Sequence, residues 1–144
     1  MANSSARLLP ARAVVFSRDA TVGLCAITTR PMAVSQHFVA YLCDPRVLPE
    51  YLLFSLKAMS QHLERMSLGA TIATIGMTDV RALAIPLPAV EEQRSIIRFI
   101  SEGIAQLDGM MAKVEAAVIR LIEYRQALIA SAVTGTIDLR EAIA

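Results

Sequence analysis

Apolar residues recur with a strict seven-residue period over the last third of the chain. Successive apolar positions there are alternately three and four residues apart. They are Ile97, Ile100, Ile104, Leu107, Met111, Val114, Val118 and Leu121, and Leu128 continues the register. Such a repeat keeps an apolar stripe facing one partner, whereas the 3.6-residue turn of a straight helix lets it drift. The pattern predicts a helix over about residues 90–133, about 65 Å long.

The helix is expected to pair lengthwise with another long helix, because its stripe would be sticky if it were left open. The alternative, a helix that folds back on its own small domain, is disfavoured by the length. Arg125 interrupts the stripe. A charged residue at such a position can fix the register of two helices or pair with a partner carboxylate, at some cost in stability. The alternative is that the pairing ends before Arg125.

Before residue 89 the pattern changes to short runs typical of an α+β domain. Strands are expected at residues 13–17, 21–28 and 34–43, with a tight turn over residues 18–20. Alternation along the third run would put Ser35 and His37 on one face and Gln36 on the other.

A helix is expected to follow, beginning at Pro49, where a missing N–H is harmless in the first turn, and ending at Gly69. An irregular, threonine-rich stretch and an extended segment at residues 84–88 come next. The buried face of the expected helix consists of Leu52, Leu56, Met59, Leu63 and Met66.

Composition limits the classes of function. The chain has 144 residues, 55% of them hydrophobic, which is enough for a core. Its net charge is +1, so DNA binding would depend on locally placed charge. Cys25 and Cys43 lack a CxxC spacing and are expected to be buried free thiols in a reducing cytosol. No apolar run reaches the roughly 18 residues of a membrane span, so we expect a cytoplasmic protein without a membrane partner.

The chain contains no enzyme pattern. Glycine-rich nucleotide motifs, zinc-ligand spacings and a nucleophile elbow are all missing from the sequence. His37 and His62 are the only histidines. Either could be read as a metal ligand or general base, but a solvated or structural histidine is favoured. The sequence therefore predicts no catalytic residue, no metal and no cofactor.

Six short strings follow one another between residues 14 and 138. They are FSRDATVG from Phe16, AVSQHF from Ala33, LPEYLL from Leu48, GATIATI from Gly69, IPLPAVEEQ from Ile85 and VTGTID from Val133. In this order they resemble the specificity subunits of type I restriction–modification systems. The resemblance implies the second half of a target-recognition domain over residues 1–88, a coiled-coil spacer helix over 89–135 and a tail over 136–144.

The resemblance also implies a function. Full-length members carry two recognition domains and two antiparallel long helices that set the gap between two DNA half-sites. The chain is then expected to bind DNA and to scaffold methyltransferase and restriction subunits, with no catalysis or cofactor of its own. In isolation it is expected to form a homodimer through the long helix. The alternative is an assembly module that does not read DNA and that dimerises or competes through its helix. The near-neutral charge and the absence of the first half-domain favour this alternative.

Candidate DNA-facing residues lie in three segments. Ser35, Gln36 and His37 are candidates for contacts to base edges. Arg18 and Arg65 are candidates for phosphate contacts, and Thr71 and Thr74 are weaker donors in a loop without Lys, His or Gln. For each of them ordinary surface or turn polarity is the alternative. We expect Arg18, the threonine loop and the segment around His37 to share one face of the domain.

Overall fold

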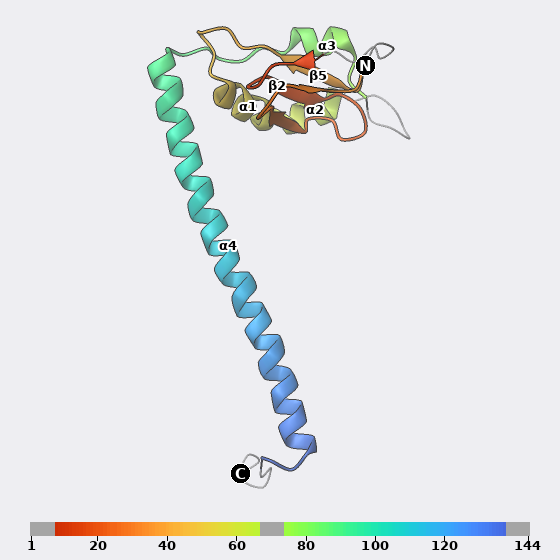
Figure 1. Ribbon diagram of the computed structural model, residues 1–144, viewed down its shortest axis with the longest axis vertical. Helices are drawn as coiled ribbons and strands as arrows, with labels where there is room; N and C mark the ends of the chain where they lie inside the picture. Colours follow the sequence, from red (N-terminus) through yellow and green to blue (C-terminus); the bar gives the residue numbers. More distant parts are fainter. Residues whose placement is uncertain (1–7, 67–73, 138–144) are drawn as a thin grey trace. The chain divides into compact units, whose positions relative to one another are not determined.

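The computed structural model describes residues 8–66 and 74–137 (Figure 1). The chain divides into two compact units, Met1–Phe99 and Ile100–Ala144, which are described separately. The first unit holds the strands, the short helices and the first turns of the long helix. The fold is therefore α+β with one long C-terminal helix, as predicted.

A three-stranded antiparallel sheet forms the centre of the first unit, in the order β3–β2–β5. Val14 and Phe16 of the middle strand are fully buried, because they pack in one core cluster with Leu56, Leu63 and Ile75. A second, two-stranded sheet pairs β1 with β4. The strands are β1 (Leu8–Leu9), β2 (Val14–Ser17), β3 (Cys25–Ile27), β4 (Met32–Ala33) and β5 (Phe38–Tyr41).

The expected strand over residues 34–43 was wrong. The chain changes sheets there, since β4 pairs with β1 whereas β5 pairs with β2. Ser35, Gln36 and His37 lie in the connecting turn, which the Phe38 N–H closes on the Ser35 carbonyl oxygen at 3.2 Å. The alternation predicted for these three residues does not occur, and all three are exposed.

The strand expected over residues 21–28 is also shorter, and the tight turn over 18–20 is a longer connection. Only Cys25–Ile27 pair with β2. Ala20 and Gly23 adopt left-handed backbone conformations, with φ of 62° and 91°. A Cβ at Gly23 would lie 3.6 Å from the Leu63 side chain, so this connection packs closely on Leu63.

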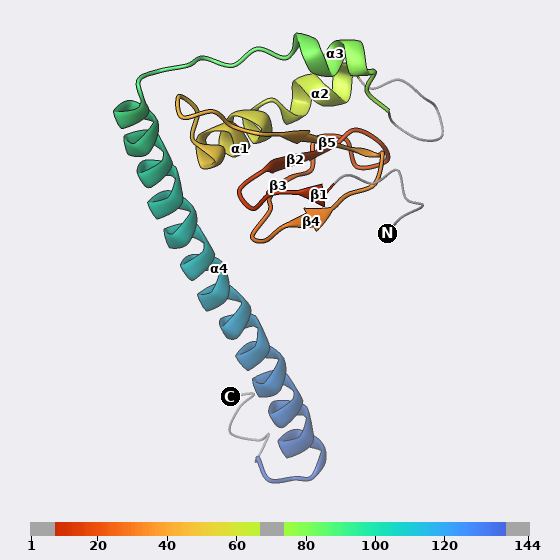
Figure 2. The same cartoon turned by 45° about the horizontal axis from the view of Figure 1, so that its top comes forward.

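The single helix expected from Pro49 to Gly69 is divided into α1 (Pro49–Ala58) and α2 (Ser60–Met66). At Met59 the backbone leaves helical geometry, with φ −88° and ψ 5°. The expected buried face survives the break, since Leu56 and Leu63 are both almost fully buried. α1 contacts β2 and β3 (Figure 2). α3 (Met77–Ala82) adds Val80 to the same core.

The long helix α4 (Val90–Val133) has the predicted limits. Gln93, in its first turns, is fully buried. From Glu102 to Ala130 every residue except Gly103 is exposed. Across the described ranges no helix has the length and apolarity needed to cross a membrane.

Both cysteines are free thiols, as predicted. Cys25 is buried in the core, and burial raises the pKa of its thiol to about 11. Cys43 is only half-buried.

Candidate nucleic-acid interface

Three segments that are distant in sequence meet at residues Arg18 and Asp19. The Arg18 N–H donates to the His37 carbonyl oxygen at 3.0 Å, on the side of the turn before β5. On the other side the Ile75 N–H donates to the Arg18 carbonyl oxygen at 3.0 Å, and Asp19 forms an antiparallel β-bridge with Thr74. The backbone therefore brings Arg18, His37 and Thr74 together, as the sequence predicted.

The Asp19 carboxylate lies at the centre of this cluster. Its Oδ2 is 2.5 Å from Nδ1 of His37, and its Oδ1 is 3.5 Å from Nε of Arg18. The hydrogen bond with His37 is the main cause that lowers the pKa of Asp19. The Thr74 hydroxyl and the charges of Arg18 and His37 add to this effect, while burial opposes it. Asp19 is thus a carboxylate shared by three candidate residues.

Exposure separates His37 from the two side chains beside it. The side chain of His37 is 57% exposed, whereas those of Arg18 and Asp19 are half-buried, at 26% and 19%. Ser35 and Gln36 are exposed beside His37, and the Ser35 Oγ accepts a hydrogen bond from the His37 N–H at 3.4 Å. The resulting surface, which we call the His37 surface, consists of Arg18, Ser35, Gln36, His37 and the half-buried Thr74.

Two predicted residues remain outside this surface. Arg65 is exposed in the last turn of α2, and within residues 8–66 and 74–137 no hydrogen bond or ion pair joins it to Arg18, Asp19 or His37. Thr71 lies outside the described residues.

Sequence reasoning missed the role of Asp19. The prediction treated Asp19 only as a turn residue. Its partner His37 is 18 positions away, a separation that no helical or strand period relates. Only the pairing of β2 with β5 brings the two side chains together.

The apolar stripe of α4 is open to solvent for most of its length. Ile97 and Ile100 are half-buried, but from Ile104 to Leu121 the exposed fractions run from 43% to 67%. Arg125 and Leu128 are exposed as well. Helix pairing is expected on this exposed part of the stripe, which consists of Ile104, Leu107, Met111, Val114, Val118 and Leu121.

A second apolar stripe adjoins the first in the C-terminal half of α4. Its members follow helical spacing and are all exposed: Ile119, Ile122, Ile129 and Val133. The sequence prediction overlooked it. Ile119, Ile122 and Ile129 directly follow Val118, Leu121 and Leu128 of the first stripe, so the seven-residue repeat is the same with or without them. The C-terminal half of α4 is therefore apolar over a wider face than a two-stranded coiled coil covers.

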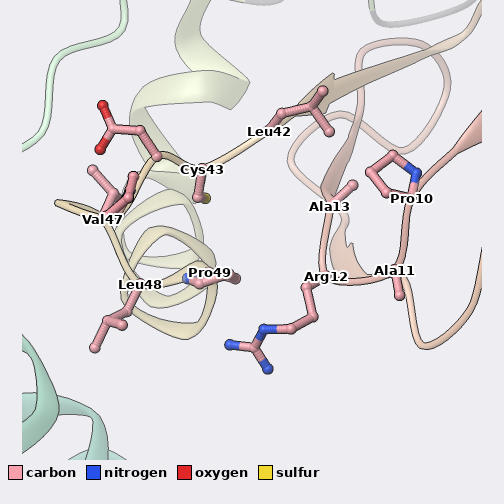
Figure 3. A pocket seen from close by; sticks show the side chains of 11 residues that line it. Pro10, Ala11, Arg12, Ala13, Leu42, Cys43, Val47, Leu48 and Pro49 are labelled. Carbon is pink, nitrogen blue, oxygen red and sulfur yellow. The ribbon is translucent and has the colours of Figure 1, made fainter.

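A pocket of about 420 Å³ lies beside the start of α1 (Figure 3). Its lining is mainly apolar, with Arg12 at its edge held by an ion pair to Glu50 at 2.9 Å. Burial, followed by the charges of Asp44 and Glu50, raises the pKa of the Cys43 thiol. A thiol with a raised pKa is a poor nucleophile, so this pocket does not favour cysteine chemistry.

The described residues contain no group of three or more His, Cys, Asp or Glu side chains that could hold a metal ion. Asp19 and His37 form a carboxylate–imidazole pair, but among residues 8–66 and 74–137 no third acidic, histidine or cysteine side chain joins them as a ligand.

Comparison with known proteins decides the family. A family model described as the type I restriction modification DNA specificity domain matches residues 1–117. The chain belongs to this family. The resemblance predicted from the six strings is thereby confirmed.

Curated specificity subunits are similar to parts of the chain. The type I restriction enzyme MjaIX specificity subunit of Methanocaldococcus jannaschii is 31% identical over 99 residues, covering 67% of this chain and 23% of the relative. The StySPI specificity subunit of Salmonella potsdam is 30% identical over 93 residues, covering 63% of this chain and 20% of the relative. The chain thus spans about a quarter or less of the length of these relatives.

Solved structures give the same result for the fold. A chain solved in work on complex assembly and conformational transition of the type I R-M system matches with a TM-score of 0.71 and 26% identity. The match covers 88% of this chain and 31% of the other. The type I S subunit from M. genitalium matches with a TM-score of 0.58 at 19% identity, covering 74% of this chain and 29% of the other, and supports the fold alone.

Proposed function

We propose that this specificity-family chain contributes a DNA-facing surface and an assembly helix to a cytoplasmic type I restriction–modification complex. The observation that carries the proposal is the His37 surface, where three segments bring Arg18, His37 and Thr74 together in a member of this family. Residues 1–88 would face DNA, and the helix over 89–135 would hold the other subunits.

The chemistry of the His37 surface suits nucleic acid. A guanidinium suits a phosphate, while amide, hydroxyl and imidazole groups suit base edges. Arg18 takes the first role, and Ser35, Gln36 and His37 take the second. Arg65 and Thr71 are proposed as further phosphate contacts.

The low net charge limits the affinity of the isolated chain for DNA. The net charge is +1, so few phosphates can be neutralised and few counterions released. Binding by the chain alone is expected to be weak, with a shallow dependence on salt. Tight binding is expected only together with methyltransferase subunits, which would bring their own DNA contacts and the methylation chemistry. The chain itself is proposed to have no catalytic activity and to need no cofactor.

The exposed stripes of α4 support the assembly role. In isolation the stripe from Ile104 to Leu121 would be covered by a second copy in an antiparallel helix pair. The adjoining stripe of Ile119, Ile122, Ile129 and Val133 would remain open in that pair. It is proposed to dock a methyltransferase subunit, and the restriction subunit would join through it.

The test is a mobility-shift assay with randomised duplex DNA, using the chain alone and in complex with the methyltransferase subunit of its own system. The complex should shift DNA far more strongly than either component. Arg18→Ala in the chain should weaken the shift about equally for all sequences. The matched control is Arg46→Ala, since Arg46 is an exposed arginine paired with Asp44.

Two results would speak against the proposal. An unchanged shift for Arg18→Ala relative to Arg46→Ala would remove Arg18 from the DNA contact. Assembly with the methyltransferase subunit but no shift by the complex would leave only the alternative, an assembly module that does not read DNA.

A further inference from the structure

The Asp19 carboxylate determines which nitrogen of His37 faces a ligand. An ionised carboxylate only accepts hydrogen bonds, so Nδ1 of His37, 2.5 Å from Oδ2, must carry a proton. In the neutral ring the other nitrogen, Nε2, is then an acceptor with a lone pair. Because the His37 side chain is three times as exposed as that of Asp19 (57% against 19%), solvent and ligands reach the imidazole rather than the carboxylate.

Asp19 is held firmly enough to impose this tautomer. The backbone of Arg18 is hydrogen-bonded on one side to His37 and on the other to Ile75, and Asp19 itself bridges to Thr74. The second carboxylate oxygen, Oδ1, is inaccessible and lies 3.5 Å from Nε of Arg18. One carboxylate oxygen is thus shielded from water, the other bonds His37, and the lowered pKa of Asp19 keeps the group ionised near neutral pH.

We propose that Asp19 is a positioning residue for base selection: by fixing the proton on Nδ1 of His37, it presents Nε2 as an acceptor to the amino group of adenine or cytosine. In the major groove adenine and cytosine offer the N6 and N4 amino donors, whereas guanine O6 and N7 and thymine O4 only accept. This inference rests on the proposed DNA-binding function. It specifies that His37 accepts a hydrogen bond from the base, a direction that the exposure of His37 alone does not determine.

Substitution of Asp19 by asparagine changes the hydrogen bonding of this side chain while nearly preserving its size. The side chains have nearly the same size, but asparagine offers Nδ1 of His37 either a carbonyl acceptor or an amide donor. The tautomer is then no longer imposed, and Nε2 can donate as well as accept. The matched control is Asp44→Asn, because Asp44 is an exposed aspartate paired with Arg46 and not with His37.

The first measurement needs no DNA. Long-range ¹H–¹⁵N spectra of the full chain identify the protonated nitrogen of each neutral histidine ring. His37 should show the proton on Nδ1 in the unsubstituted chain and in Asp44→Asn, and a mixture of tautomers in Asp19→Asn. A proton on Nε2 of neutral His37 in the unsubstituted chain would overturn the inference, whatever the chain binds.

The second measurement selects from a library of randomised duplex oligonucleotides with the chain in complex with its methyltransferase subunit. At one position the unsubstituted complex should favour adenine or cytosine. Asp19→Asn should reduce that discrimination roughly three- to tenfold, the value of one hydrogen bond, while Asp44→Asn leaves it unchanged. In a His37→Ala background Asp19→Asn should have no further effect, since Asp19 acts through His37.

The outcomes separate this inference from the function on which it rests. No enriched sequence with the unsubstituted complex overturns the proposed DNA-reading function and this inference with it. Enrichment that Asp19→Asn leaves unchanged overturns only the inference. A loss of discrimination from Asp19→Asn that persists in the His37→Ala background would show that Asp19 acts by another route, and would likewise overturn it.

Discussion

The side-chain amide of Gln93 donates a hydrogen bond to the carbonyl oxygen of Arg46 at 2.8 Å, across 47 positions of the chain. The same amide donates to the Pro88 carbonyl oxygen at 2.9 Å, and Oε1 accepts from the Leu48 N–H at 2.9 Å. Gln93 is fully buried, so these three bonds satisfy a polar group that water cannot reach. They join the first turns of α4 to the loop that leads into α1.

Gln93→Ala should therefore destabilise the first unit. The substitution leaves the Leu48 N–H and the Arg46 carbonyl oxygen without their partner, at a cost of about 2–4 kcal/mol in the free energy of unfolding. Urea unfolding followed by circular dichroism measures this loss. The matched control is Glu92→Ala, since Glu92 is the preceding, exposed helix residue. Equal midpoints for the two variants would contradict the anchoring role of Gln93.

Local patterns were enough to predict the elements that local interactions define. The heptad repeat gave the limits of α4, and the buried faces of Leu56 and Leu63 followed from helical spacing. The turn at Ser35–His37 was missed because it depends on which strands β4 and β5 pair with, and both partners are distant in sequence.

The same limit applies to the candidate site. Arg18, His37 and Thr74 could be named from their residue types and from the family resemblance. Asp19 could not, because its role depends on His37 arriving from another strand connection. The break at Met59 was missed for a related reason: helical spacing of apolar residues continues across it, while the backbone does not.

The hydrogen bond between Asp19 and His37 predicts how the Asp19 carboxyl titrates in acid. The pKa of Asp19 is lowered from the ordinary value of 3.8, mainly by the hydrogen bond with His37. A carboxyl whose folded-state pKa is lowered stabilises the fold above its unfolded-state pKa. That contribution is lost as the pH falls through the folded-state pKa.

His37→Ala should accordingly raise the pKa of Asp19 toward 3.8, and the contribution of Asp19 to stability above that pH should shrink with the difference between its folded and unfolded pKa values. Carboxyl ¹³C chemical shifts followed from about pH 6 to about pH 2 report this change, a range that spans the reference value for aspartate. Asp44 serves as an internal control, because its pKa is lowered by hydrogen bonds from Arg46 and not by His37. A shift of both carboxyls would indicate a general loss of structure, and a shift of neither would contradict the Asp19–His37 coupling.

The first stripe of α4 predicts that the isolated chain associates. Light scattering at micromolar concentration should give a mass above the monomer's 15.6 kDa. Replacing Leu107 and Val114 with lysine should return the chain to a monomer, since burial of unpaired charge costs several kcal/mol. Phe99→Lys is the matched control, because Phe99 is 79% exposed and lies off the stripe. A monomer without any substitution would exclude helix pairing in isolation.

Substitutions in the second stripe are predicted to impair binding of the methyltransferase subunit and not self-association. Ile122 and Ile129 are exposed at 44% and 57%, and both are displaced by one position from the stripe that the helix pair would cover. Replacing both with lysine should leave the self-association of the chain largely intact, because neither side chain is at the centre of that pair. Co-purification with the methyltransferase subunit should instead fall, since that subunit would have to bury the new charges. The Leu107 and Val114 double variant, tested beside it, should lose self-association. If the Ile122 and Ile129 variant retains the methyltransferase subunit but becomes monomeric, the two stripes form one pairing surface, and docking must use another part of the chain.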